Sequence, residues 1–327
     1  MAGKLIKQAT EFKNGWNKPV DDVSIGQNIS IIIPVYHPEH LKEVLNHLAY
    51  IGGYQEIILV DDSGLFDGYS YDYLEQFKNV KVIYHNKNLG RPAARNTGVS
   101  YSNGDILVFL DQDMFLSPDF LMTVEKYYYT NKSMIFLGLR DTLPYEEILQ
   151  GRDWQNPDMV RDWRIRTEVM PEFIDLTVLE VGNAFNGCKP HEIIYIADST
   201  DNLRKMGILA DDTLGFWDLP SMVVSHSMAI SKKDFIKIGG FPEWIQGWGG
   251  EDIVLGFLAC SAHIPIYLSK CVSYQAYHSP YSGSEETKKE ELKGNIKHYR
   301  EWANSIDDFP VFQFNENRRR GHIWQKE

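Results

Sequence analysis

The sequence lacks any apolar run that approaches the roughly 20 residues needed to span a bilayer. The best such run extends only from Ile106 to Leu110, and the N-terminus has no apolar stretch typical of a secretory signal. We therefore expect a protein with no transmembrane segment.

Cysteine is scarce, and the three that occur, Cys188, Cys260 and Cys271, share no spacing typical of a metal site and cannot all pair. Reduced thiols are typical of the cytoplasm. The sequence therefore predicts a cytoplasmic protein, with a peripheral position at the inner face of the membrane compatible with this.

Positive charge is in deficit, because 33 Lys and Arg residues face 45 Asp and Glu residues and give a formal net charge of -12. Such a chain repels phosphate backbones and anionic lipid, so we expect no nucleic-acid partner. Apolar residues make up 43% of the 327 residues and charged residues only 24%. This composition supplies a sizeable core and excludes global disorder.

Short apolar runs alternate with helical patterns along the first part of the chain. Strands are predicted at 31–35, 56–60, 80–84, 106–110 and 133–139, and helices at 40–50, 71–78, 93–101 and 118–129. This alternation indicates an α/β fold with a mostly parallel sheet covered on both faces. Ligands of such sheets bind beyond the carboxyl ends of the strands.

The remainder of the chain is less regular up to residue 219. A strand is predicted at 221–230, a helix at 251–262, a strand at 264–268 and a charged helix at 285–302. No internal repeat is evident.

Carboxylates follow two of the predicted strands directly. Asp111 and Asp113 flank Gln112 after the fourth strand, and alternation leaves the two aspartates pointing the same way. Hard oxygen ligands in this arrangement suit Mg²⁺ or Mn²⁺ carrying a diphosphate. Asp61 and Asp62 follow the second strand, where an acidic side chain either accepts from a ribose or base or closes the strand in an Asx-turn.

Cations, glycines and a tryptophan supply further candidates. Arg91 and Arg95, at a predicted helix start, are suited to phosphate or a base. In the string Trp248-Gly249-Gly250-Glu251-Asp252, the tryptophan offers a flat face for a sugar ring, and the carboxylates are either helix-capping groups or a general base. His278 is a structural histidine unless the fold brings it to Asp113.

These pieces together resemble the GT-A glycosyltransferases, particularly the family-2 enzymes, over about residues 31–279. The resemblance rests on seven strings in the family's order: Pro34-Val35-Tyr36, Val60-Asp61-Asp62-Ser63, Asn88-Leu89-Gly90 leading into Ala94-Arg95-Asn96-Thr97-Gly98, the Asp111-Gln112-Asp113 triplet, Gly239-Gly240-Phe241, Trp248-Gly249-Gly250-Glu251-Asp252 and Tyr277-His278. The WGGED string is similar to the acceptor-side motif of β-1,4-galactosyltransferases and bacterial chondroitin-type polymerases.

The resemblance implies roles for individual residues. Asp62 would contact the uracil and Asp111 the ribose side of the donor. Asp113 and His278 would bind Mn²⁺ or Mg²⁺, and Asp252 would be the catalytic base. Further donor contacts would come from Pro34, Tyr36, Arg91, Arg95 and Gln112, and the acceptor and sugar pocket would be shaped by Trp248, Gly250 and Glu251.

The resemblance also divides the chain. It implies a nucleotide-sugar-binding half at 29–140 and an acceptor-binding and catalytic half of the same GT-A domain at 141–302, between an N-terminal extension at 1–28 and a C-terminal tail at 303–327. The two terminal segments are expected either to pack on the domain or to mediate self-association into a homo-oligomer.

The function that the sequence predicts is metal-dependent, inverting transfer of a hexose or N-acetylhexosamine from a UDP-sugar to a glycan or glycoprotein hydroxyl, with UDP-glucose or UDP-N-acetylglucosamine favoured. The setting expected is bacterial surface glycan or protein glycosylation. Aspartate at 252 favours inversion, because related retaining enzymes carry asparagine there. The alternatives are a nucleotidyltransferase of related fold, a glycosidase and a non-catalytic sugar-binding protein.

Overall fold

The computed structural model describes residues 28–64, 71–77, 79–149, 162, 178–180, 193–195, 223–262, 264, 266–276, 284–304 and 322–323. His278 lies outside the described residues, as do nearly all of the predicted N-terminal extension and most of the C-terminal tail.

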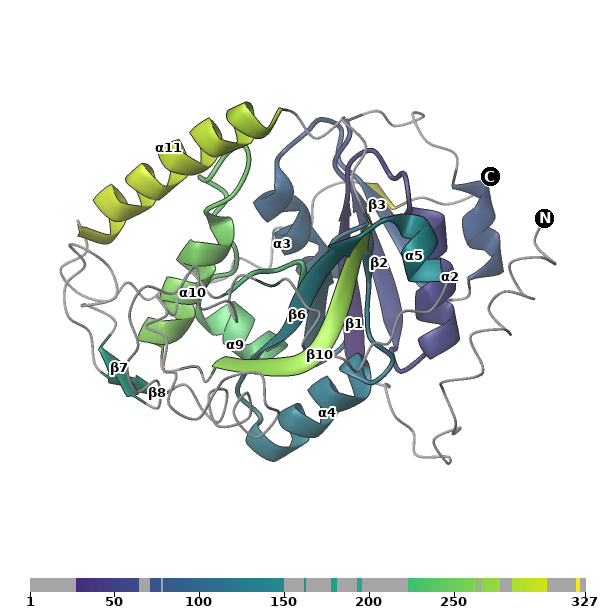
Figure 1. Cartoon of the computed structure of the whole chain (residues 1–327), viewed down its shortest axis with the longest axis horizontal. Helices are drawn as coiled ribbons and strands as arrows, with labels where there is room; N and C mark the ends of the chain where they lie inside the picture. Colours follow the sequence, from purple (N-terminus) through teal and green to yellow (C-terminus); the bar gives the residue numbers. More distant parts are fainter. Residues whose placement is uncertain are drawn as a thin grey trace.

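The described residues form a nine-stranded sheet with the order β11-β3-β2-β1-β4-β9-β6-β10-β5 (Figure 1). Neighbours among β1, β2, β3 and β4 pair in parallel, as do β6 and β10, whereas β9 is antiparallel to both β4 and β6. The strands are β1 (Ile29–Val35), β2 (Glu56–Asp61), β3 (Val80–Tyr84), β4 (Ile106–Leu110), β5 (Met114–Phe115), β6 (Ile135–Leu143), β9 (Ser227–Ser231), β10 (Ile266–Ala276) and β11 (His322–Ile323). A separate two-stranded antiparallel sheet pairs β7 (Val178–Glu180) with β8 (Ile193–Tyr195).

The predicted α/β architecture is confirmed. The first four strands lie within two residues of their predicted bounds, and the antiparallel pairs made by β9, β5 and β11 add to the predicted sheet. The helices are α2 (Leu41–Ile51), α3 (Arg91–Tyr101), α4 (Phe120–Asn131), α5 (Tyr145–Leu149), α9 (Lys232–Lys237), α10 (Glu251–Ser261) and α11 (Glu285–Asn304), with a 3-10 turn, η2, at Asp72–Gln76.

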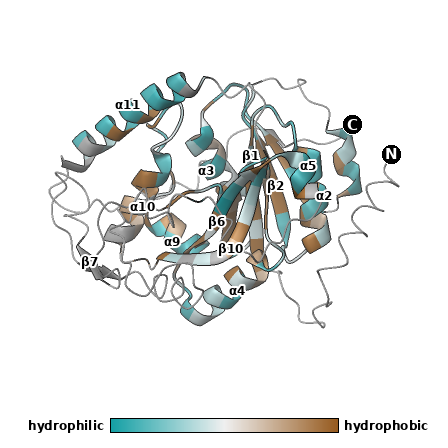
Figure 2. Ribbon diagram, viewed as in Figure 1, coloured by the Kyte–Doolittle hydropathy of each residue, from teal (hydrophilic) through white to brown (hydrophobic). Residues whose placement is uncertain are grey.

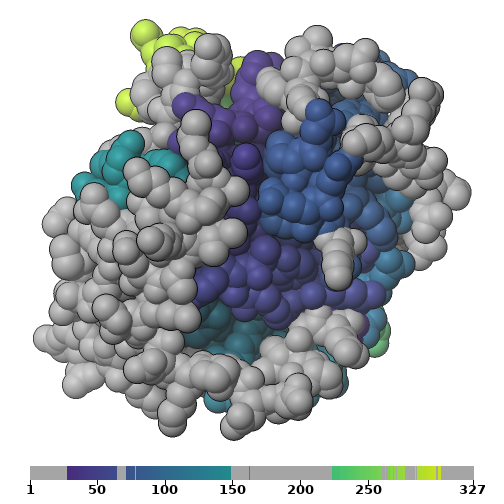
Figure 3. Space-filling view, turned by 90° about the vertical axis from the view of Figure 1, so that its right-hand side faces the viewer, coloured from purple at the N-terminus to yellow at the C-terminus, as the bar shows by residue number. Residues whose placement is uncertain are grey.

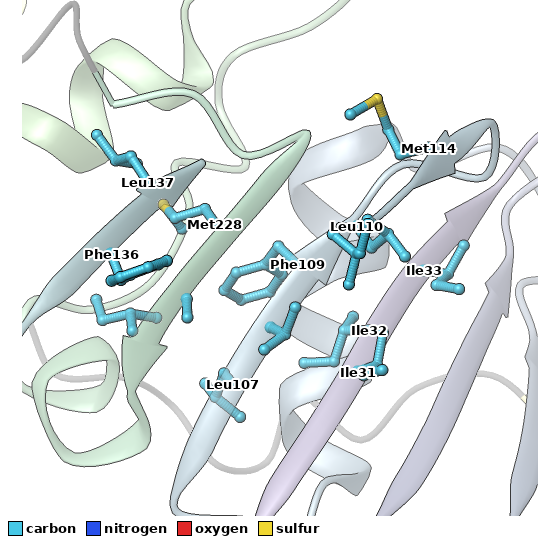
Figure 4. Packing of buried hydrophobic residues seen from close by; sticks show 14 of the residues in the cluster. Ile31, Ile32, Ile33, Leu107, Phe109, Leu110, Met114, Phe136, Leu137 and Met228 are labelled. Atoms are coloured by element: carbon cyan, nitrogen blue, oxygen red, sulfur yellow. The ribbon is translucent and has the colours of Figure 1, made fainter. Parts of the chain in front are cut away.

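The central strands are apolar because both of their faces are covered. All five side chains of β4 are buried, and Figure 2 shows brown stretches along the central strands while α11 is largely teal. Figure 4 shows buried side chains of β1 and β4, with Ile31, Ile33 and Leu110 on one face of the sheet and Phe109 on the other. This continuous core fixes the strand ends that carry the predicted site residues.

The helix α3 packs directly on β1. A Cβ atom at Gly98 would overlap the Cγ2 methyl of Ile32, so only glycine permits this close approach. Figure 1 shows α3 and α2 on opposite sides of β1 and β2, and in Figure 3 the coloured surface of one face comes mainly from purple and blue N-terminal segments. The close packing of α3 places its first turn beside the ends of β2 and β4.

Within the part of the chain that the structure describes, no helix is both long and apolar enough to cross a bilayer.

Candidate active site

Arg95, on α3, is the centre of the site. Its side chain is only 1% exposed, and its Nη2 donates to Asp111 Oδ1 at 3.0 Å, just beyond the end of β4. Its Nη1 donates to Glu251 Oε1 at 3.0 Å and lies 3.7 Å from Asp252 Oδ1. One guanidinium therefore joins the end of β4 to the start of α10, and four residues predicted separately from the sequence meet here.

The carboxylates of Glu251 and Asp252 occupy the first turn of α10, where the helix dipole favours negative charge. Glu251 is almost fully buried, and its Oε2 has no hydrogen-bond partner among the described residues. Arg91, one helical turn before Arg95, approaches Glu251 Oε1 at 3.5 Å. An orphaned acceptor in a buried site suits a hydroxyl donor from a ligand.

Ser225 orients Asp252. Its hydroxyl, fully buried, donates to Asp252 Oδ1 at 2.5 Å. The next residue, His226, accepts the backbone N–H of Asp111 at 3.0 Å through its carbonyl. Because β9 is antiparallel to β4, the residues just before β9 arrive at the same edge of the sheet as Asp111.

The surroundings shift two of these pKa values in opposite directions. Burial, together with the neighbouring charge of Glu251, raises the pKa of Asp252 to about 6, against the opposing effects of Arg95 and the Ser225 hydroxyl. Burial acts to raise the pKa of Asp111 as well, but the charges of Arg95 and Arg91 outweigh it and lower that pKa. Two carboxyls with separated pKa values suit different chemical roles.

Asp113, the predicted metal ligand, is buried at the turn between β4 and β5. Gln275, near the end of β10, donates from Nε2 to Asp113 Oδ2 at 3.0 Å, and the backbone N–H of Ala276 donates to the Asp113 carbonyl at 3.0 Å. The described part of β10 thus ends beside Asp113, two residues before His278. Among the described residues, no group of three His, Cys, Asp or Glu side chains is placed to hold a metal ion.

Asp62 holds the loop that precedes α3. Its Oδ1 accepts from the backbone N–H of Leu89 at 2.8 Å and is 2.7 Å from His85 Nδ1, and its Oδ2 accepts from Gly90 N–H at 2.8 Å. The other ring nitrogen of His85 lies 2.9 Å from Thr97 Oγ1. Both carboxylate oxygens of Asp62 are therefore engaged by other groups of the protein. Its predicted contact with uracil stays a prediction.

The two β1 residues predicted at the donor site lie near the end of that strand. Pro34 is half-buried and in register with Val60 of β2, and Tyr36 is 50% exposed just after the strand. Gln112 fixes this backbone, because its Oε1 accepts from Tyr36 N–H at 2.8 Å and its Nε2 donates to the carbonyls of Tyr36 and His37. The side chain of Gln112 is thus hydrogen-bonded to the backbone of Tyr36.

Trp248 stands in a glycine-rich loop before α10 with its side chain 37% exposed. Gly250, the last residue of that loop, has a φ of +97° and accepts Val254 N–H at 3.2 Å. This loop leads into the turn that carries Glu251 and Asp252.

Three residues that contribute to the site carried no sequence signal of their own. Ser225, His85 and Gln275 each contact a predicted residue from an element distant in sequence. Asn96 belongs to one of the strings named above, but the fold alone brings it to Phe241, where its side chain accepts from the backbone N–H and donates to the backbone carbonyl.

Comparison with known proteins covers both halves of this site. Residues 30–179 match the profile of Glycosyl transferase family 2, and residues 221–257 match that of the N-terminal domain of galactosyltransferase. The first segment contains Arg95, Asp111 and Asp113, and the second contains Ser225 and the run from Trp248 to Asp252.

Several curated proteins are similar to the chain. It is 24% identical over 290 residues to the uncharacterized glycosyltransferase YfnE of Bacillus subtilis (strain 168), which covers 86% of this chain and 72% of YfnE. It is 35% identical over 120 residues to a poly(ribitol-phosphate) beta-glucosyltransferase of Bacillus spizizenii, covering 34% of this chain and 18% of that protein. It is 26% identical over 255 residues to a validoxylamine A glucosyltransferase of Streptomyces hygroscopicus subsp. limoneus, covering 74% of this chain and 50% of that protein.

Among solved structures, S. aureus TarS 1–349 in complex with UDP-GlcNAc matches with a TM-score of 0.48 and 14% identity, over 85% of this chain and 70% of that one.

The two matched segments show a glycosyltransferase, and it is built on the mixed α/β sheet described above. The predicted enzyme class is thereby confirmed. The match to the family-2 profile extends over residues 30–179, and the chain spans only half or less of the two named glucosyltransferases.

Proposed function

We propose that the chain transfers a hexose or N-acetylhexosamine from a UDP-sugar to a hydroxyl of a glycan or glycoprotein, with inversion and with a divalent metal ion. The observation that carries this proposal is the placement of Asp252. Its carboxylate is held by Ser225 and faces Arg95, the residue that also binds Asp111.

Asp252 has the properties of a general base. With a pKa of about 6 it is mostly ionised at neutral pH, yet more basic than an ordinary aspartate. The Ser225 hydroxyl engages Oδ1, so Oδ2 is the oxygen suited to accept the acceptor proton while the acceptor oxygen attacks the anomeric carbon. Activity should therefore rise with pH through about 6 as this carboxyl ionises.

The charge of the site supports a metal-dependent donor complex. Three carboxylates, those of Asp111, Glu251 and Asp252, lie against the guanidiniums of Arg91 and Arg95, and Asp113 adds its charge near Arg91, so negative charge is in excess. A diphosphate would add to this excess, which supports the proposal that a divalent cation accompanies the donor. Hard carboxylate oxygens fit Mn²⁺ or Mg²⁺, and we propose that Asp113 and His278 hold the ion.

When bound, the ion would neutralise charge that develops on the departing diphosphate. Side chains of the chain would bind and orient the donor. Arg91 and Arg95 would supply positive charge near the diphosphate, and Glu251 Oε2, which has no hydrogen-bond partner among the described residues, would accept from a sugar hydroxyl. Holding donor and acceptor in line lowers the barrier further.

The donor is proposed to be UDP-glucose or UDP-N-acetylglucosamine, and the setting bacterial surface glycan or protein glycosylation. The names of the curated relatives support a glucosyl donor, since two of the bacterial proteins described above are glucosyltransferases.

The first experiment measures donor hydrolysis. A panel of UDP-sugars is incubated with Mn²⁺, with and without chelator, and released UDP is scored. Turnover of one sugar only with metal would support the proposal and identify the donor. If neither hydrolysis nor binding of UDP, GDP or CDP is found, the proposal is wrong.

The second experiment tests Asp252. The Asp252→Asn variant should retain UDP binding and lose most transfer, because asparagine cannot accept the acceptor proton. Full transfer activity in this variant would remove Asp252 from the mechanism.

The third experiment tests Asp113 by UDP titration with and without chelator. The parent should lose UDP affinity on addition of chelator, and the Asp113→Ala variant should bind weakly under both conditions. An Asp113→Ala variant whose affinity fell with chelator as much as the parent's would refute the assignment.

A further inference from the structure

The loop at residues 246–250, here called the Trp248 loop, is seated on helix α11. The side-chain amide of Asn295 donates to the carbonyls of Gln246 and Gly249 at 2.9 and 2.8 Å, and lies 3.4 Å from the carbonyl of Trp248. Glu291 Oε2 accepts the backbone N–H of Trp248 at 2.9 Å. Two side chains of α11 therefore engage four polar groups of the loop backbone, the N–H of Trp248 and the carbonyls of Gln246, Trp248 and Gly249.

The glycines of the loop are needed for this seating. Gly247, Gly249 and Gly250 have φ values of +76°, +78° and +97°, which L side chains rarely adopt. A Cβ at these three positions would also lie 2.9, 2.8 and 3.0 Å from atoms of Glu291, Leu292 and Asn295 respectively. The loop and α11 thus fit each other at successive positions of one helix face.

The helix itself is well anchored at its other end. Tyr299 is 1% exposed, and its ring and that of Trp302 pack against Phe257 of α10 with centroid separations of 5.9 and 5.8 Å. Trp244, just before the loop, contacts Trp302 at 5.5 Å. Figure 1 shows α11 lying along the side of the molecule that carries α10. An anchored helix provides a rigid support for the loop.

The contacts between the loop and α11 determine where the Trp248 side chain lies. Its backbone N–H is bonded to α11, while Trp248 as a residue remains 37% exposed, immediately before the turn that carries Glu251 and Asp252. We propose that Glu291 and Asn295 are positioning residues, which hold Trp248 so that its ring presents a stacking face to a sugar acceptor beside Asp252. This inference rests on the proposed function.

The first test needs no substrate. Hydrogen exchange of the full chain is followed by mass spectrometry in the variants Asn295→Ala and Glu291→Ala, with Glu290→Ala, an exposed neighbour on α11, as the matched control. Loss of the α11 contacts should speed exchange at residues 246–250 by about tenfold, since each lost hydrogen bond lowers local protection. Unchanged exchange in both variants would overturn the inference.

The second test separates this inference from the proposed function. p-Nitrophenyl β-glucoside, N-acetyl-β-glucosaminide and β-galactoside serve as acceptor probes, with UDP binding measured alongside. Asn295→Ala and Glu291→Ala should raise the acceptor KM by about tenfold with little change in kcat or in UDP binding. Glu291→Gln, whose amide oxygen still accepts from the Trp248 N–H, should restore the parental KM.

The outcomes are distinguishable. If the parent transfers to a probe and both variants keep its acceptor KM, the inference is wrong and the proposed function stands. If the parent neither binds UDP nor hydrolyses a UDP-sugar, the proposed function fails, and the inference falls with it. If the parent hydrolyses donor but uses none of the three probes, the exchange experiment decides the positioning of Trp248.

Discussion

Arg95 and Glu251 form an ion pair 3.0 Å long between α3 and α10, and the two side chains are only 1% and 2% exposed. They are 156 residues apart in sequence. The pair connects the half of the sheet that ends at Asp111 with the turn that carries Asp252, so the site depends on it for its geometry.

Replacing Arg95 by methionine should therefore be severe. The substitution leaves the buried Glu251 and the partly buried Asp111 without their cation, and loss of one partner of a buried ion pair costs about 3–5 kcal/mol. Urea unfolding measures the effect. Arg91→Met is the comparison, because its side chain is 36% exposed and 3.5 Å from Glu251, and should cost no more than about 1 kcal/mol. Equal losses in the two variants would contradict this account.

Asp252 should make stability depend on pH. Its pKa is raised to about 6 in the folded protein, so its contribution favours folding below about pH 4 and is lost as pH rises through 6. Asp252→Asn removes this titration. The variant should gain stability relative to the parent between pH 4 and pH 7, by about 1–3 kcal/mol. Unfolding curves at several pH values measure the difference; a difference that is constant with pH is the contrary result.

Gly98→Ala should destabilise the fold through packing alone. The added methyl would overlap the buried Ile32, and overpacking of this kind costs about 1–3 kcal/mol. Gly294→Ala is the matched control, because a Cβ there meets nothing within 4 Å in the middle of α11. That variant should gain up to about 1 kcal/mol from helix propensity. Thermal unfolding of both proteins compares them, and a neutral Gly98→Ala would mean that α3 can move away from β1.

Glu56 lies at the start of β2, at the end of the sheet away from the candidate site. Its carboxylate should stabilise the fold at pH values above those at which it becomes protonated. Burial would raise its pKa, but hydrogen bonds from Lys81, Ser30 and Asn103 lower it below the ordinary value. Its contribution is therefore present above about pH 4.5 and is lost as pH falls further. Glu56→Gln should cost about 1–3 kcal/mol at pH 7.

Exposed Glu39→Gln is the control for Glu56 and should be neutral. Chemical denaturation at pH 7 and at pH 3.5 measures both variants. An effect of Glu56→Gln that is as large at the lower pH as at pH 7 would argue against the ionic contribution.

The buried parallel strands were predictable because strands covered on both faces are continuously apolar, as β4 is. The strand β10 was predicted to end at residue 268 and continues to Ala276. Polar residues such as Ser269 and Gln275 interrupt its apolar pattern, and its pairing with β6 shifts register between Leu268 and Val272. The direction of β9 is set by tertiary pairing and has no local signal.

The candidate site likewise has residues that the sequence predicts and contacts that only the fold reveals. Asp111 and Asp252 could be singled out because one follows an apolar strand and the other begins a helix. That Arg95 lies between them, and that Ser225 holds Asp252, depends on contacts between distant parts of the chain. Asp62 shows the reverse case, since its sequence context indicates a ligand contact while its oxygens bond to the loop before α3.

The antiparallel strand β9 has a consequence for how substrate range can diversify. Because β9 is antiparallel to both β4 and β6, the chain leaves the sheet at Leu143 and rejoins it at Ser227 on the same edge as Asp111. The segment that connects these two strands therefore ends at Ser225, which bonds Asp252, while Leu143 at its beginning pairs with Ala276 beside Asp113. Sequence changes between Leu143 and Ser225 can therefore reach the candidate site from both ends without altering the pairing of β4, β6 and β9, on which the positions of Arg95, Asp111 and Asp252 depend.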